Sequence, residues 1–241
     1  MIAGQVYSVH MKDDSDTKNP PAQGAEAGMH AFRHPRDRDT YRHGDLKRAL
    51  LEAGIALARE GGPQAIVLRE ATRRVGVVPN AAYRHFTNRQ ALLQAVRAAA
   101  LSALAQAMET ELARIPSGLS AEARARASVR AIGTGYLAFA REEPGLFRTA
   151  FAAPDRVEDD ADPAKAGRSG LNPFQLLGKA LDELVTAQSL PAQRRPGAEY
   201  LAWSAVHGLA MLMLDGPLRA ISPDEARVIG DHLLDMVERG L

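Results

Sequence analysis

Hydrophobic side chains recur at helical spacing along most of this sequence, and this spacing most restricts the folds open to the chain. Leu46, Leu50, Ala53 and Leu57, for example, follow one another at intervals of three or four residues and form one stripe of a helix. No stretch sustains the alternation of apolar and polar residues, rich in β-branched side chains, that a half-buried strand requires. The sequence therefore predicts an all-α fold.

Glycine and proline divide this pattern into separate helices. A first helix ends at Gly61, Gly62 and Pro63, because these residues disfavour its continuation. A short second helix ends at Gly76, where a left-handed C-cap suits glycine, and Pro79 takes the first position of a third. The predicted helices span about 45–60, 68–75, 79–86, 88–115, 121–141, 146–151, 173–188, 197–214 and 223–239.

Three of these helix starts carry capping signatures. Thr87 with Gln90, and Ser222 with Glu225, fit the capping box, in which each side chain accepts a hydrogen bond from the other residue's backbone N–H. Asn172 stands directly before a proline, as an N-cap does when proline occupies the first helical position. The residue types thus fix where these helices begin.

Composition excludes several classes of protein. The chain has no cysteine, so it has no disulfide framework and no thiolate metal site, and it suits a reducing cytosol. Its first residues are polar and do not form a signal peptide. The most apolar stretch, 198–214, is interrupted by Glu199 and His207 and is shorter than the roughly 20 residues that a membrane span needs. We expect a cytoplasmic protein that does not associate with a membrane.

Charge is distributed unevenly along the chain. Residues 30–97 hold 13 basic and 6 acidic side chains, a net charge of +7, whereas residues 98–241 have a net charge of −4. A basic module joined to an acidic one indicates that only the basic module faces a polyanion. Residues 1–40 show no hydrophobic period and are predicted to be a disordered extension. Residues 153–171 also lack such a period and are predicted to form a mobile loop.

Two short helices joined by the glycine turn at Gly76, with a longer helix before them, are typical of a helix-turn-helix. The second short helix, 79–86, carries Asn80, Tyr83, Arg84 and His85, which offer donors and acceptors to base edges and phosphates. A plain helical hairpin, with its aromatic residues in the core, would give the same periodicity. Spacing alone leaves both interpretations open.

The stretch 50–96, LLEAGIALAREGGPQAIVLREATRRVGVVPNAAYRHFTNRQALLQAV, resembles the N-terminal DNA-binding domain of TetR-type transcriptional regulators. The resemblance implies a helix-turn-helix domain over 41–90 followed by a helical ligand-binding and dimerisation domain over 91–241. It also implies a homodimeric repressor that binds a double-stranded DNA operator and is released by a small-molecule effector. The DNA-binding residues it implies are Pro79, Asn80 and Arg84 for bases, with Tyr83, His85 and Arg89 for phosphates.

The sequence departs from this family at helix starts. Val78 stands in the turn, and Val67 and Leu68 at the start of the second helix, where the family usually has Ser or Thr that cap helices and touch phosphates. Ala81 and Ala82 remove polar contacts from the reading helix. The basic cluster over 33–43 is either a solvated tail or an arm for the minor groove, and either Met1 or Met29 could be the true start.

The segment around Trp203 and His207, with Gly208 after it, resembles the C-terminal ligand domain of one TetR subgroup marked by Trp, His and Gly at this spacing. The resemblance implies a pocket for a hydrophobic or aromatic effector. Its candidate ligand-binding residues are Phe139, Phe147, Phe151, Phe174, Leu177, Trp203, His207 and Met211. A Trp and a His four residues apart also fit an ordinary helix core.

An enzyme centred on His207 is the main rival from another class. The only nucleophile near it in sequence is Ser204, and no acid stands at helical spacing to orient such a pair. Further His or acidic ligands are also missing from that face, so we expect no metal and no cofactor. A regulator without an effector, either an activator or an architectural protein, is the nearer alternative.

The last predicted helix carries two apolar stripes. Ala226, Ile229, Leu233 and Met236 form one, and Leu234, Val237 and Leu241 form the other. One stripe faces the core, and the second needs a partner. The resemblance supplies that partner, because in the family the last two helices of each subunit form a four-helix dimer interface.

Overall fold

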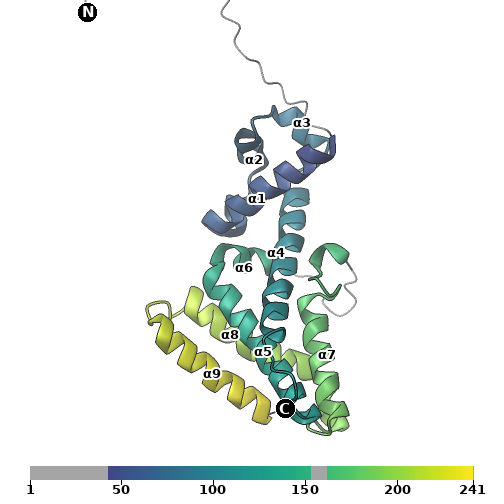
Figure 1. Ribbon diagram of the computed structural model, residues 1–241. Coiled ribbons are helices and arrows are strands. Elements are labelled where there is room, and N and C mark those ends of the chain that lie inside the picture. The colour runs from purple at the N-terminus through teal and green to yellow at the C-terminus, as the bar shows by residue number, and fades with distance from the viewer. Residues whose placement is uncertain (1–42, 153–161, 241) are drawn as a thin grey trace, which may run out of the picture. The chain divides into compact units, whose positions relative to one another are not determined.

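Within residues 43–152 and 162–240, which the computed structural model describes, the chain forms nine α-helices and two short 3₁₀ helices and no strand (Figure 1). The predicted all-α fold is confirmed. The predictions for the extension 1–40, for the basic cluster before His43, for residues 153–161 of the loop and for Leu241 lie outside the described residues. The α-helices are α1 (His43–Ala65), α2 (Leu68–Val75), α3 (Pro79–Tyr83), α4 (Arg89–Leu112), α5 (Ala121–Glu142), α6 (Pro144–Ala150), α7 (Pro173–Thr186), α8 (Ala198–Leu214) and α9 (Pro223–Gly240).

Most predicted helix ends are confirmed. Gly76 closes α2 in the left-handed conformation, at φ 74° and ψ 28°. Asn172 caps α7 in a full capping box with Gln175. At α9, the Ser222 hydroxyl accepts from the Glu225 N–H at 3.2 Å, and the Glu225 carboxylate accepts from the Ser222 N–H at 2.9 Å. These local signals decide the ends because each satisfies backbone groups that the helix itself leaves unpaired.

Several helix ends differ from the prediction by one to five residues, and three of these differences have a clear local cause. The N-cap of α4 is Asn88, not Thr87, because the Asn88 side chain accepts from the Ala91 N–H at 2.9 Å. Helix α3 ends at Tyr83 rather than Phe86, since the N–H groups of His85 and Phe86 share the Ala82 carbonyl in a closing turn. The range of α1 runs to Ala65, but its backbone leaves helical geometry at the two glycines after Glu60.

Helix α4 lies at the centre of the described structure. Its first half packs against α1 through Leu92 and Val96, and its second half packs against α5 through Leu104 and Met108. It is the one helix of the described residues whose length and mean hydropathy would suffice to cross a membrane, and half of its apolar window is buried inside the protein. Packing in the core therefore accounts for its apolar character.

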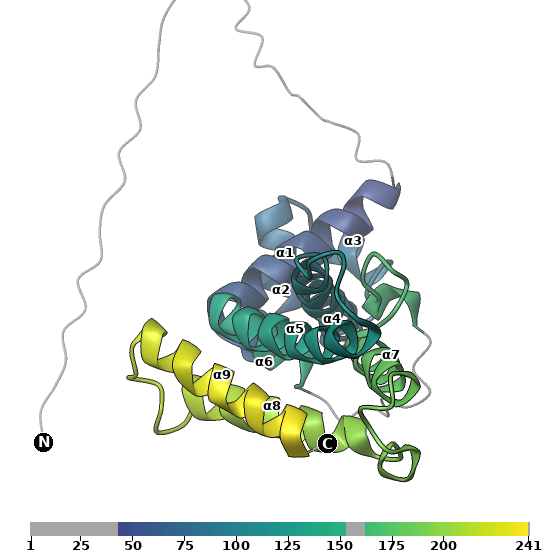
Figure 2. The same ribbon diagram turned by 60° about the horizontal axis from the view of Figure 1, so that its bottom comes forward.

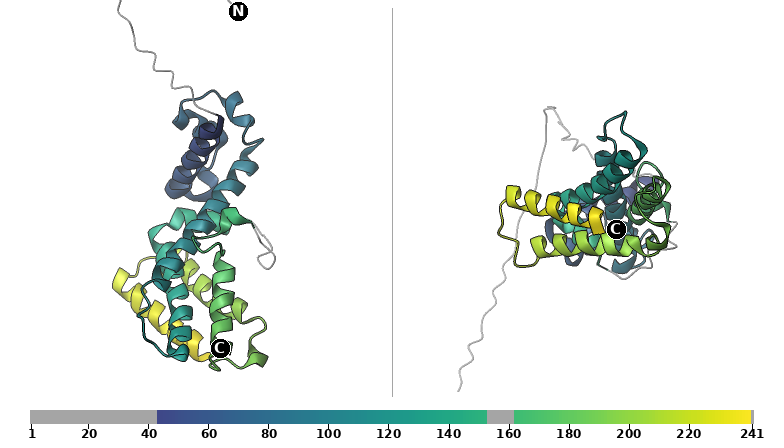
Figure 3. Two further views of the ribbon diagram at one scale, coloured as in Figure 1. Left: turned by 45° about the vertical axis from the view of Figure 1, so that its right-hand side comes forward. Right: turned by 90° about the horizontal axis from the view of Figure 1, so that it is seen from below.

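The C-terminal helices lie around α5. Helix α7 packs on one side of α5, and α8 and α9 lie side by side on another (Figures 2 and 3). Helix α6 lies between α1 and the C-terminal helices and packs against α1, α4 and α5. Helices α4 and α6 thus connect the N-terminal helices α1–α3 with the C-terminal helices.

The described end of the predicted loop is held against α4. Residues 163–165 form a 3₁₀ helix, and the Ser102 hydroxyl donates to the Ala166 carbonyl at 2.6 Å. The Glu109 carboxylate accepts from the backbone N–H groups of Arg168 and Ser169, each at 2.8 Å. Apart from the short 3₁₀ helix, residues 162–171 form no regular helix, as the sequence predicts, and polar groups of α4 satisfy part of their backbone. The mobility of the segment stays a prediction.

Candidate DNA-reading surface and effector cavity

Helix α3 presents most of its predicted DNA-binding residues to solvent. Pro79, Asn80, Tyr83 and Arg84 are exposed, and His85 is half-buried. Tyr83 is 53% exposed, so it does not belong to the core as the hairpin interpretation would have it. The helix is instead anchored by Ala82 and Phe86, which are buried. One face of α3 is thus available to a partner.

The arginines near this face fall into two groups. Arg73 and Arg74 on α2 are held by acidic partners: Arg73 Nη2 lies 2.7 Å from Glu70, and Arg74 Nη2 lies 2.6 Å from Glu60. Hydrogen bonds from Arg73 and Arg74 lower the pKa of Glu70 to about 2, so these pairs stay charged at any physiological pH.

Arg69 and Arg84 form the second group. Both are exposed, and neither side chain has an acidic partner within the described part of the chain. Sequence reasoning overlooked Arg69, although a signal was present. Glu70 finds its helical partners three and four residues later, which leaves the guanidinium of Arg69 for something else.

Arg89, the predicted phosphate contact at the start of α4, has internal partners. Its Nε donates to the Ile66 carbonyl at 2.8 Å, and its Nη2 donates to the Pro63 carbonyl at 2.7 Å. These bonds tie the turn after α1 to the first residue of α4. A contact with phosphate stays a prediction, whereas the structure gives Arg89 a role in holding the helix-turn-helix together.

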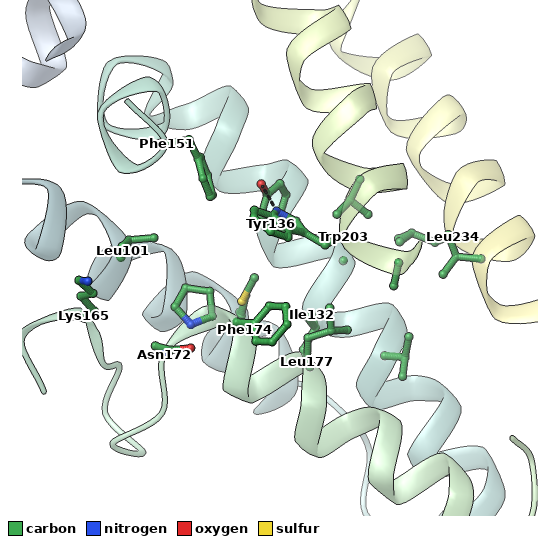
Figure 4. Close-up of a pocket in the computed structure, with 17 residues that line it drawn as sticks. Leu101, Ile132, Tyr136, Phe151, Lys165, Asn172, Phe174, Leu177, Trp203 and Leu234 are labelled. Atoms are coloured by element: carbon green, nitrogen blue, oxygen red, sulfur yellow. Dashed lines mark hydrogen bonds between the residues drawn. The ribbon is translucent and has the colours of Figure 1, made fainter. Parts of the chain in front are cut away.

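A largely apolar cavity lies among α4, α5, α7, α8 and α9 (Figure 4). The cavity has a volume of about 70 Å³. Its wall consists of Leu101, Met108, Val129, Ile132, Gly133, Tyr136, Phe151, Lys165, Asn172, Pro173, Phe174, Leu177, Ala202, Trp203, Val206, Leu234 and Val237. Binding pockets for small molecules have this character, with mostly apolar walls and few polar groups.

Four of the eight predicted ligand-binding residues line this cavity, namely Phe151, Phe174, Leu177 and Trp203. The other four do not line it. Phe139 and Phe147 are buried in the core, and His207 and Met211 are partly buried beside it. The helical period alone cannot separate these groups, because core and cavity wall carry the same apolar residue types.

Tyr136 of α5 lines the cavity and was missed from the sequence. Its hydroxyl accepts from Trp203 Nε1 at 3.1 Å and lies 2.7 Å from His207 Nδ1 (Figure 4 shows the bond between Tyr136 and Trp203). Burial raises the pKa of the Tyr136 hydroxyl and lowers the pKa of His207. A buried tyrosine needs a hydrogen-bond partner, and the pair of Trp203 and His207 in the sequence was the signal that could have led to it.

These three side chains form a chain of hydrogen bonds beside the cavity. The hydroxyl of Tyr136 accepts from Trp203, and it can donate its own proton to Nδ1 of neutral His207 in the tautomer that leaves this nitrogen unprotonated. His207 therefore serves as a partner for Tyr136 and is not paired with Ser204. Among the described residues, no group of His, Cys, Asp and Glu is arranged to hold a metal ion.

Helix α6 touches both the cavity region and α1. Phe151 at its C-terminal end lines the cavity, and the ring of Phe147 lies 5.3 Å from that of Tyr136 and 5.7 Å from that of His207. At the other end, the Glu143 carboxylate accepts from Arg59 Nε of α1 at 3.0 Å. The buried Arg97 of α4 donates to the carbonyl of Ala150 at 2.9 Å, which holds the C-terminal end of α6 against α4.

The outer faces of α8 and α9 carry exposed apolar residues. Leu201 and Leu212 are exposed on α8, and Val228 and Met236 are exposed on α9. Inward packing of α9 uses Ala226, Gly230 and Leu234. The two predicted stripes are therefore arranged differently from the expectation: Ala226 and Leu234 share the inward face, and Met236 points away from it. Gly230 has no side chain, so this part of α9 can lie close to Leu137 of α5. The face of α9 that carries Gly230 is therefore the buried one.

Comparisons with known proteins agree with this architecture. Residues 50–96 match the family described as bacterial regulatory proteins, tetR family, and residues 129–237 match the Tetracyclin repressor-like C-terminal domain. A solved protein of unknown function from Rhodococcus sp. RHA1 is 26% identical, with 85% of this chain and 99% of that one covered at a TM-score of 0.65. A TetR protein from Acinetobacter baumannii AYE has the same fold, at 16% identity, 83% and 95% coverage and a TM-score of 0.55. No curated protein matched the sequence.

The fold and its exposed short helix define a helix-turn-helix DNA-binding regulator with a helical C-terminal domain. The chain belongs to the TetR family of bacterial transcriptional regulators, as the two matched ranges, which together span more than half of it, establish.

Proposed function

We propose that this protein is a dimeric, cytoplasmic repressor that leaves its DNA operator when a hydrophobic, uncharged small molecule fills the cavity. The observation that carries the proposal is the position of α6. This one short helix contributes Phe151 to the cavity wall, and its Gly145 packs directly against the backbone of α1. A change at the cavity therefore has a path of direct contacts to the helix that supports the DNA-reading surface.

Readout of DNA is assigned to the exposed face of α3. The N-terminal residues of a recognition helix reach base edges in the major groove. We assign the donors and acceptors of Asn80 and Arg84 to that role, and the exposed side chains of Tyr83 and Arg69 to phosphates beside it. His85 is half-buried and reaches less far.

The effector is inferred from the cavity wall. Aromatic and aliphatic side chains make up most of the wall, and its polar groups are Tyr136, Asn172 and Lys165. A charged group placed among the apolar side chains would lose its hydration without a matching partner beside it. We therefore infer a mainly apolar compound with few hydrogen-bonding groups.

The dimer is inferred from α8 and α9. Their exposed apolar residues lie on helices that pack together, so a second copy can cover both at once. A twofold dimer presents two copies of α3, which must enter successive major grooves roughly 34 Å apart on a near-palindromic site.

Release follows if the ligand prefers the arrangement that cannot bind DNA, because a ligand with equal affinity for both states shifts nothing. Coupling of about 1–3 kcal/mol would weaken DNA binding about 5- to 150-fold, and DNA would weaken ligand binding by the same factor. Trp203 is the only tryptophan and lines the cavity, so its emission reports occupancy directly.

The test starts from DNA selected out of a random pool by the full-length protein. A panel of uncharged aromatic and aliphatic compounds is then titrated against Trp203 emission, with the protein free and bound to the selected DNA. We expect weaker ligand binding in the DNA complex. Equal affinities in the two states for every compound that binds would contradict the release mechanism and favour a regulator without an effector.

A further inference from the structure

The DNA-reading face of α3 is unusually poor in hydrogen-bonding groups. Val78 and Pro79 contribute two of its exposed side chains, and the half-buried Ala81 contributes no polar group. Asn80 and Tyr83 on the helix, with Arg84 and the half-buried His85 directly after it, offer donors and acceptors. Among residues 78–82, however, Asn80 is the one polar side chain, so the start of the helix can contact bases mainly through apolar groups.

Val78 occupies the most informative position on this face. It is the N-cap of α3, in extended conformation at φ −70° and ψ 144°, and its side chain is 69% exposed. The N-terminal end of a recognition helix points at the base edges. No side chain caps α3, so valine forgoes the stabilising bond that Ser, Thr, Asp or Asn would supply there.

Neighbouring residues do not bury the valine, so burial within the described chain does not offset the missing capping bond. Burial of the valine side chain against DNA would offset it. In the major groove the thymine C5-methyl is the apolar group that distinguishes one base from the others, and aliphatic side chains pack against it.

We propose that Val78 determines specificity by packing against a thymine methyl group in each half-site, so that this regulator selects one thymine by apolar contact. The inference rests on the proposed role of α3 as the DNA-reading helix. It adds a specificity-determining residue at the start of α3, where few side chains can hydrogen-bond to bases.

Val67 supplies a matched control within the same domain. It is also an exposed valine at a helix N-cap without a side-chain capping bond, at the start of α2, and it is 43% exposed. In a helix-turn-helix the first of the two helices crosses the backbone while the second lies in the groove. Val67 thus shares the local chemistry of Val78 but not its place at the bases.

The experiment uses the full-length protein and a duplex selected from a random pool. Each thymine is replaced singly by deoxyuridine, which lacks only the C5-methyl, and dissociation constants are measured for the wild type, Val78→Ser and Val67→Ser. For the wild type we expect one thymine per half-site whose replacement weakens binding about four-fold, the value of one buried methyl group. Replacement in both half-sites should weaken binding about fifteen-fold.

Val78→Ser should abolish this uracil effect, and Val67→Ser should retain it. The comparison is a ratio within each variant, so any change in helix stability from the new cap cancels. The inference is overturned if no thymine in the selected site is sensitive to uracil, or if Val78→Ser keeps the full effect. A pool that yields no preferred sequence overturns both this inference and the proposed function, whereas a preferred sequence without a uracil effect overturns the inference alone.

Discussion

Gly145 of α6 lies against the backbone of α1 so closely that a Cβ atom on it would stand 2.1 Å from the carbonyl oxygen of Ala58. The next atoms it would meet, at 2.7 and 3.0 Å, belong to the Arg59 carbonyl group, so the obstacle is backbone that cannot rotate away. Glycine at this position therefore allows α6 to touch α1 directly. In the proposed release mechanism, this contact is one route by which ligand binding reaches the DNA-binding domain.

Gly145→Ala should push α6 away from α1. We expect a loss of about 1–3 kcal/mol in the free energy of unfolding, as overpacking a tight contact typically costs, together with reduced coupling between ligand and DNA. Urea unfolding and the two Trp203 titrations measure these effects. Gly178→Ala is the control, because its Cβ would meet only side-chain atoms, an oxygen at 3.4 Å and a nitrogen at 3.8 Å. Unchanged stability and coupling in Gly145→Ala would show that α6 does not carry the signal.

Arg69→Ala should weaken binding to every DNA sequence about equally. A phosphate contact releases counterions, so its loss should make the slope of log affinity against log salt shallower by about one unit. Arg73→Ala is the matched control on the same helix, since its guanidinium is already bonded to Glu70. The DNA affinity of both variants is measured from 50 to 200 mM salt. If the slope of log affinity against log salt is the same for Arg69→Ala and Arg73→Ala, Arg69 does not contact phosphate.

Arg89→Ala should lower stability through the loss of two hydrogen bonds to carbonyl groups of the turn after α1. A bond from a charged donor is worth about 1.5–3 kcal/mol, and the turn holds two of them, in part exposed to water. We therefore expect a loss of about 2 kcal/mol in thermal or urea unfolding. A variant as stable as the wild type, but with a shallower salt slope, would restore the phosphate role that the sequence predicts.

Tyr136→Phe should leave Trp203 Nε1 and His207 Nδ1 without their shared partner. An unpaired buried donor costs about 1–3 kcal/mol, so we expect a loss of that size in stability and a shift in Trp203 emission. Phe139→Leu serves as a comparison, because Phe139 is buried outside the cavity wall. That variant should lower stability without moving the emission, and a Tyr136→Phe spectrum identical to the wild type would argue against the hydrogen-bonded chain.

Stability should fall as the pH is lowered through the range below 6.5, in part because of His207. Burial lowers the pKa of His207 in the folded protein below its ordinary value of 6.5, so the unfolded chain takes up this proton first. The free energy of unfolding must then rise with pH across that window. Urea unfolding between pH 5 and 8 should show a smaller pH dependence in His207→Gln than in the wild type. Identical pH dependence would mean that His207 stays accessible to protons in the fold.

Much of this protein is determined by short stretches of sequence. The left-handed glycine at Gly76, proline at Pro79 and the capping box at Ser222 place helix ends to within a residue or two. These signals work from sequence because each depends on backbone groups three or four residues away. The choice of Asn88 over Thr87 shows their limit, since two adjacent residues can both cap and the surrounding packing selects one.

The tertiary structure alone decided which buried residues meet. A helical stripe shows which face of a helix leaves solvent, but not which other face it meets or where the packing leaves a space. Phe147 lies in α6 and Phe151 directly follows that helix, yet the first fills the core and the second lines the cavity. Tyr136 comes into contact with Trp203 and His207 across about 70 residues of sequence. Such contacts depend on how whole helices cross, which no local pattern of side chains specifies.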